Sequence, residues 1–95
     1  MPEVRLLGGL RELMGESAVN FDSQAVRELL EEISRRGGEA VAKLLYDEDG
    51  IAPSQDLKIL VNGRSVAFLA GLDTALQAGD TVTLHLSGAR GYPGG

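Results

Sequence analysis

One amphipathic helix, placed between two groups of short strand-like segments, is the feature that most limits how this chain can fold. Its apolar residues recur every three or four positions and so share one helical face: Val26, Leu29, Leu30 and Ile33. Ser23 is the expected N-cap of this helix, and Gly37-Gly38 is expected to end it. A helix with a single apolar stripe must bury that stripe against another layer, so the flanking strands are expected to form a sheet.

The segments on either side of the helix have the length and the apolar alternation of strands. In chain order, the expected strands are residues 4–7, 18–21, 57–61, 66–69 and 81–86. Asn62-Gly63 predicts a hairpin turn before the fourth strand. A helical turn is expected at residues 10–14 and a short second helix at residues 39–46. With the first and last strands parallel in the middle, this order predicts an α+β fold of the β-grasp, ubiquitin-like type, a mixed sheet with one long helix packed across it.

Composition excludes several classes of protein. The 95 residues suffice for one small domain, and they contain no cysteine, which excludes disulfides, thiolate metal sites and a cysteine nucleophile. Nine basic against fourteen acidic residues disfavour direct nucleic-acid binding. The sequence shows neither a signal peptide nor a membrane-spanning run, so a cytoplasmic protein without a membrane partner is expected. His85 is the only histidine, and no metal site or catalytic set accompanies it, so the chain is not expected to be an enzyme.

The last nine residues differ from the rest of the chain. Residues 87–95 hold four glycines and no apolar period, and they end in Gly94-Gly95. We therefore expect a β-grasp domain over residues 1–86 and a flexible C-terminal diglycine tail over residues 87–95.

Five stretches of the sequence, taken in order, resemble the ubiquitin-like sulfur carriers. That family includes the small subunit of molybdopterin synthase (the MoaD type), the thiamine-pathway carrier (the ThiS type) and the archaeal small modifier proteins. The similar stretches are residues 6–15 (LLGGLRELMG), 26–30 (VRELL), 59–64 (ILVNGR), 69–82 (LAGLDTALQAGDTV) and 94–95 (GG). Many members end in Pro-Pro-Val, then Ala or Ser, then Gly-Gly, directly after the last strand. Here residues 87–93 form a longer tail with one proline, which leaves the pathway open.

The resemblance implies chemistry at the carboxylate of Gly95, performed by a partner. An E1-like adenylyltransferase would use ATP to form an acyl-adenylate there, and a sulfur nucleophile would convert it to a thiocarboxylate. Gly94 and Gly95 lack a Cβ and so suit a narrow channel, while Pro93 restricts the tail to extended conformations. Arg90 and Tyr92 would give the partner a charged and an aromatic handle, or else are ordinary solvated tail residues. The chain itself is expected to bind no cofactor and no metal.

A docking surface is expected on the sheet face away from the helix. Leu60 and His85 should point outward there, joined by Leu7, although scattered exposed apolar residues are the alternative interpretation. The expected partners are the E1-like adenylyltransferase and either the large subunit of molybdopterin synthase or lysines of target proteins.

Three functions fit this interpretation. The favoured one is sulfur donation in molybdopterin (molybdenum cofactor) biosynthesis. The alternatives are protein modification, in which Gly95 is conjugated to lysines, and a non-covalent β-grasp adaptor. Because the chain has only two lysines, Lys43 and Lys58, conjugates are expected mainly on other proteins rather than on itself.

Overall fold

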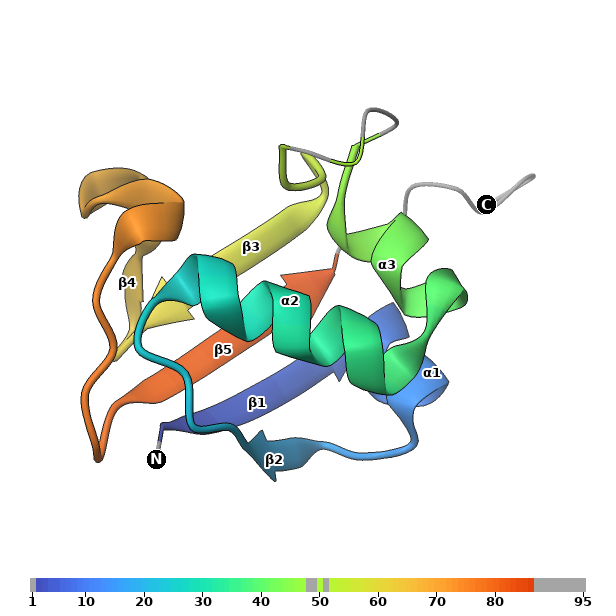
Figure 1. Ribbon diagram of the computed structural model, residues 1–95, viewed down its shortest axis with the longest axis horizontal. Coiled ribbons are helices and arrows are strands. Elements are labelled where there is room, and N and C mark those ends of the chain that lie inside the picture. The colour runs from blue at the N-terminus through green and yellow to red at the C-terminus, as the bar shows by residue number, and fades with distance from the viewer. Residues whose placement is uncertain (1, 48–49, 51, 87–95) are drawn as a thin grey trace.

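The central helix lies across one face of a five-stranded sheet (Figure 1). The computed structural model describes residues 2–47, 50 and 52–86, and in it this helix is α2 (Val26–Gly37). The sheet has the order β2-β1-β5-β3-β4, and its strands are β1 (Glu3–Gly8), β2 (Ala18–Asn20), β3 (Leu57–Val61), β4 (Arg64–Ser65) and β5 (Thr81–Leu86). β1 and β5 pair in parallel at the centre, while the other three pairings are antiparallel. The predicted β-grasp fold is confirmed.

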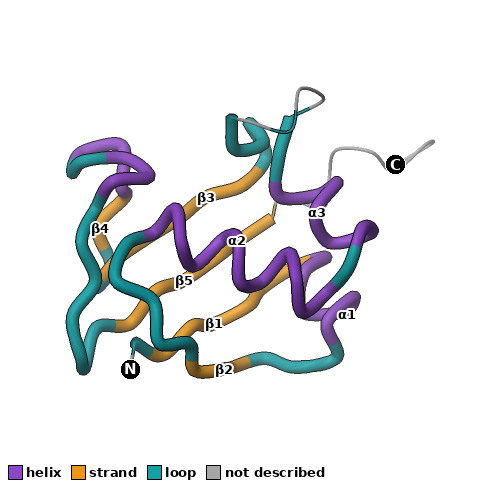
Figure 2. The backbone as a smooth tube through the Cα atoms, viewed as in Figure 1, coloured by secondary structure: helices purple, strands orange, loops and turns teal. Residues whose placement is uncertain are grey.

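The core lies between α2 and the sheet. It contains the whole predicted stripe of α2, and the inward residues of the two central strands are fully buried against it: Val4, Leu6, Val82 and Leu84. Two shorter helices, α1 (Gly9–Met14) and α3 (Glu39–Leu45), gather at one end of α2 (Figure 2). They close that end of the core with Leu10, Val41 and Leu45.

The close packing of these helices requires a glycine at residue 37. A Cβ on Gly37 would lie 2.3 Å from Cγ2 of Val41 and 2.8 Å from Sδ of Met14, which no real contact allows. The next residue, Gly38, has a positive φ of +82°, which residues with a Cβ rarely adopt, and the chain turns there from α2 into α3. The Gly37-Gly38 pair therefore ends the helix as predicted, with a different role for each glycine.

The start of α2 differs from the prediction. Ala25, not Ser23, is the N-cap residue, and it makes no side-chain capping bond. Ser23 is instead buried, and its hydroxyl has no hydrogen-bond partner among the described residues. The N–H of Val26, the first residue of α2, donates instead to the carbonyl oxygen of Thr74 at 3.0 Å, and the carboxylate of Glu28 accepts a hydrogen bond of 3.1 Å from the N–H of Gln24, which precedes the helix.

The fourth predicted strand, residues 66–69, is wrong. After the hairpin turn, β4 lasts only two residues, and Val66–Phe68 forms the 3₁₀ helix η1. The physical cause is local: the Ser65 hydroxyl accepts a hydrogen bond of 3.2 Å from the N–H of Ala67 and so caps a helical turn. A second 3₁₀ helix, η2 (Gly71–Asp73), follows, and both lie at the end of the sheet opposite α1 and α3 (Figure 2).

Candidate partner-binding site

β5 is the central strand of the sheet, and its last residue is paired with a strand on each side. Leu86 pairs with Gly8 of β1 in parallel and with Leu57 of β3 in antiparallel. Gly8 has φ +69°, and a Cβ there would lie 2.4 Å from the carbonyl oxygen of Leu86. Only glycine therefore allows β1 to approach so closely at this point. The domain thus fixes the residue immediately before the predicted tail.

The predicted tail residues lie outside the described residues. These are Arg90, Tyr92, Pro93, Gly94 and Gly95. Their roles, and the boundary between a domain over 1–86 and a tail over 87–95, stay predictions.

The three residues predicted for a partner surface lie on the same face of the sheet, opposite α2. Leu7 pairs directly with His85, and both side chains are exposed, that of Leu7 to 41%. Leu60 is half-buried and lies one strand further along, opposite Thr83 rather than opposite His85. The neighbour of His85 on β3 is Lys58. The face therefore brings Leu7 and His85 together and sets Leu60 diagonally beside them.

Two basic residues on this face, Arg5 and Lys58, were missed by sequence reasoning. Arg5 pairs with Thr83 across the strands, and Lys58 pairs with His85. The signal was available, because Arg5 and Lys58 are two positions from Leu7 and Leu60, and alternate strand residues share a face. Arg5 lies 3.7 Å from the Glu3 carboxylate, an exposed pair that contributes little, and Lys58 has no ion pair within the described part of the chain. The open face is thus apolar and basic on a protein of net charge −5.

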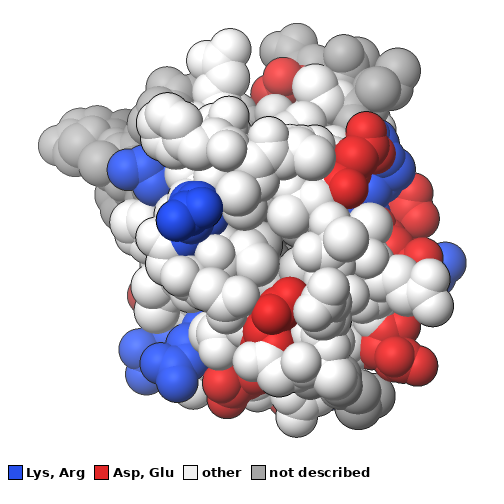
Figure 3. Space-filling view, turned by 90° about the vertical axis from the view of Figure 1, so that its left-hand side faces the viewer, with Lys and Arg blue, Asp and Glu red and all other residues white. Residues whose placement is uncertain are grey.

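The arginines on the helix side are neutralised by carboxylates. Arg27 contacts Asp73 at 3.1 Å, Arg35 contacts Glu32 at 2.8 Å, and Arg36 contacts Glu16 at 3.2 Å. Figure 3 looks at one end of the sheet, and in it basic side chains lie mainly toward the sheet side and acidic ones mainly toward the α2 side. Basic residues thus lie on both sides, but these three on the helix side are paired with carboxylates.

The described residues hold no metal-binding cluster. No group of three or more His, Asp or Glu side chains among them lies close enough together to hold a metal ion. None of the helices in the described ranges is both long and apolar enough to cross a membrane.

Comparison with known proteins places this chain in a family. The model of the ThiS family matches residues 4–84, which is most of the chain. The chain belongs to the ThiS family. This ThiS-family protein is 28% identical over 82 residues to a protein of Archaeoglobus fulgidus named "Putative sulfur carrier protein", covering 86% of this chain and 89% of the relative.

Solved structures share the fold of this chain. The small archaeal modifier protein 1 (SAMP1) of Methanosarcina acetivorans has the same fold, with a TM-score of 0.82, 21% identity and 90% of each chain covered. A chain from the BexX/CysO complex of Amycolatopsis orientalis matches with a TM-score of 0.76 and 25% identity, over 92% of this chain and 96% of that one. This protein is therefore a ubiquitin-like member of a family of small sulfur carriers and modifiers.

Proposed function

We propose that this ThiS-family protein carries sulfur on the carboxylate of Gly95, after adenylation by an E1-like enzyme, and donates it in molybdopterin biosynthesis. The observation that carries the proposal is the family match over residues 4–84, followed in the sequence by Gly94-Gly95. The fixed position of Leu86 between β1 and β3 supports it, because a rigid domain would then present the segment that follows.

The proposed reaction takes place in the partner's active site. An oxygen of the Gly95 carboxylate attacks the α-phosphate of ATP, and pyrophosphate leaves. A sulfur nucleophile, hydrosulfide in the simplest case, then adds to the carbonyl carbon, and AMP leaves, which yields a thiocarboxylate. Glycine suits this position because it has no Cβ to block the attack. The chain supplies the acyl group, and ATP is bound by the partner.

The open face of the sheet is the proposed docking surface for the activating enzyme. Leu7, His85 and Leu60 would provide its apolar centre, and Lys58 and Arg5 would provide positive charge at its border. Such a surface suits a partner with apolar residues ringed by carboxylates.

The test uses the untagged chain incubated with ATP, a sulfide source and a soluble extract of its host. The expected product has one carboxylate oxygen of Gly95 replaced by sulfur, localised by fragmentation mass spectrometry. Because the sequence contains no cysteine, alkylation with iodoacetamide marks the thiocarboxylate selectively and distinguishes it from an oxidised methionine. The matched control is the chain without Gly95, which must stay unmodified.

The outcomes separate the alternatives. Gly95 found in an isopeptide bond to lysines of other proteins would favour the modifier function, which similarity to SAMP1 keeps open. An unmodified Gly95, in an extract that thiolates a known carrier, would contradict sulfur carriage. Transfer of sulfur to a molybdopterin precursor by a reconstituted mixture with the large synthase subunit tests the pathway separately.

A further inference from the structure

The η1–η2 end of the molecule exposes an aromatic side chain that the sheet face does not include. Phe68 is 83% exposed, and its neighbour Leu69 is 39% exposed. Single exposed apolar residues are ordinary, but an almost fully exposed phenylalanine beside an exposed leucine forms a patch of the kind found in protein interfaces. Figure 3 shows a largely uncharged surface at this end, between the basic and the acidic sides.

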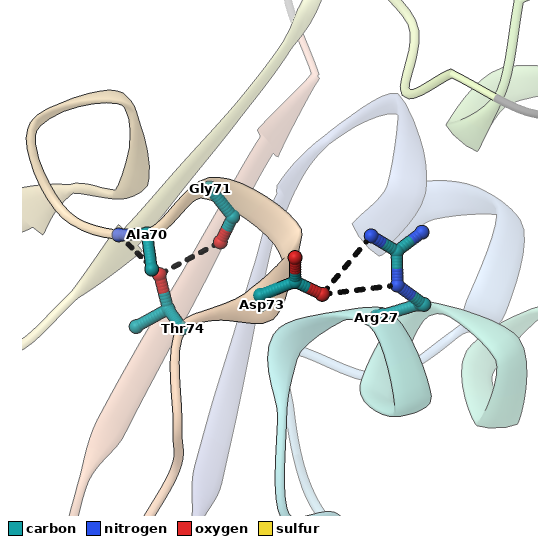
Figure 4. Close-up of polar contacts among 5 residues, drawn as sticks. All are labelled: Arg27, Ala70, Gly71, Asp73 and Thr74. Carbon is teal, nitrogen blue, oxygen red and sulfur yellow. Dashed lines mark hydrogen bonds and ion pairs between the residues drawn. The ribbon is translucent and has the colours of Figure 1, made fainter.

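The segment that carries this patch is firmly held. Val66 and Leu72 pack against the core on either side of it. The Thr74 hydroxyl donates to the carbonyl of Gly71 at 2.7 Å and accepts from the N–H of Ala70 at 3.1 Å, as Figure 4 shows. The ion pair between Arg27 and Asp73 ties η2 to α2. A rigid patch loses little conformational entropy on binding.

An arginine side chain without an ion pair among the described residues lies next to the patch of Phe68 and Leu69. Arg64 and Leu69 line the same shallow groove, whose other walls include Val61 and Ala75. Arg64 is exposed, and its side chain makes no ion pair or hydrogen bond within the described ranges, unlike Arg27, Arg35 and Arg36.

One carboxylate, that of Asp80, also lines this groove. It accepts hydrogen bonds from the N–H of Gln77 at 2.8 Å and from the side chain of Asn62 at 3.1 Å. Asp80 keeps its negative charge, but its oxygens are held by these neutral donors, and it makes no ion pair with Arg64 within the described ranges.

We propose that Phe68, Leu69 and Arg64 form a second docking surface, which binds a partner segment carrying a bulky aliphatic side chain and a nearby carboxylate. The aliphatic group would cover Phe68 and enter the groove beside Leu69, and the carboxylate would pair with Arg64. Charge complementarity selects this partner, because an acidic segment is attracted to Arg64 and a basic one is repelled. This surface is distinct from the sheet face of Leu7 and His85, so both surfaces can be engaged at once.

The test is an NMR titration of the full-length, ¹⁵N-labelled chain with a short capped peptide of Leu and Glu residues separated by Ser. The expected shift changes centre on residues 64–75. Phe68→Ser and Arg64→Glu should each weaken binding by about tenfold or more. The same peptide with Lys in place of Glu should bind at least about tenfold more weakly.

The matched controls lie on α1, at the other end of the molecule. Leu13 is 48% exposed, and Arg11 is exposed, so Leu13→Ser and Arg11→Glu repeat the same changes on an unrelated surface. Both should leave binding within about twofold of the wild-type chain. Removal of Gly95 should also leave it unchanged, which separates this proposal from the proposed sulfur chemistry.

Three results would overturn the proposal. They are the absence of shifts at residues 64–75, equal binding of the Lys peptide, and a Phe68-dependent dimer in sedimentation velocity, which would make a second copy the occupant.

Discussion

The two faces of the sheet are built from the same strands, but one face is buried against α2 and the other is exposed. On β1 and β5, the residues that face α2 are fully buried, whereas their immediate neighbours in sequence, such as Leu7 and His85, are exposed. The covered face contributes the burial that stabilises the fold, and the open face contributes little to stability. Residues on the open face can therefore be substituted, or can bind a partner, with little effect on the stability of the fold.

The sharpest form of this comparison is the pair Leu6 and Leu7. They are adjacent and chemically identical, but Leu6 has no exposed surface and Leu7 is 41% exposed. Leu6→Ala should lower the free energy of unfolding by about 2–5 kcal/mol, because it removes buried methyl groups and leaves a cavity. Leu7→Ala should change it by no more than about 0.5 kcal/mol. Urea unfolding of both variants measures the difference, and equal losses would contradict the assignment of the two faces.

Gly8 lies beside Leu86 at the end of β5, and its substitution tests how closely β1 approaches β5 there. Gly8→Ala should cost about 2–3 kcal/mol of unfolding free energy, because the residue has positive φ and its Cβ would meet the carbonyl oxygen of Leu86. Gly15 also has positive φ, but a Cβ there would meet nothing within 4 Å. Gly15→Ala should therefore cost only the backbone strain, about 1–2 kcal/mol. Thermal unfolding of the pair measures the gap, and a cost at Gly15 as large as that at Gly8 would show that no close contact exists.

The open face should be required for activation but not for folding. Leu7→Asp places a charge at the centre of the proposed docking surface and should lower kcat/KM for adenylation by about tenfold or more. Pyrophosphate release by the activating enzyme measures this effect. Leu13 on α1 is somewhat more exposed than Leu7, so Leu13→Asp is the control and should leave adenylation nearly unchanged. A loss shared by both variants would place the docking surface elsewhere or indicate a general charge effect.

The sequence predicted those parts of the fold that depend on local periodicity. The stripe of α2 and the alternation in β5 were correct because burial on one face imposes a period that the residues display directly. Asn62-Gly63 was correct because a two-residue turn needs the positive φ values, +53° and +84°, that these residues adopt most readily.

The errors arose at the ends of elements, where more than one hydrogen-bond partner is available to a backbone group. Ser65 caps η1 and so ends β4 after two residues, and the first N–H of α2 donates to the carbonyl of Thr74 rather than to the Ser23 side chain. Such choices depend on the tertiary position of the backbone, which sequence patterns do not specify.

The candidate site was predictable only in part. Leu7, Leu60 and His85 were placed on the correct face by strand alternation, whereas the pairing of Lys58 with His85 depends on a register that no single strand reveals. Arg64 and Phe68 were missed because the predicted strand would have given this segment the wrong geometry.

The smallest expected effect concerns Asp80, at the start of β5. Hydrogen bonds from the N–H of Gln77 and from the Asn62 side chain hold the pKa of its carboxyl below the usual aspartate value. Because the folded-state pKa is lowered, this contribution to stability is present above the ordinary aspartate pKa, about 4, and is lost as the pH falls through the folded-state value. The wild-type chain should therefore be more stable than Asp80→Asn at neutral pH, and the two should converge in acid. Urea unfolding of both chains between about pH 7 and pH 2 measures the convergence. A difference that stays constant or grows in acid would show that the Asp80 carboxylate is not stabilised by these two donors.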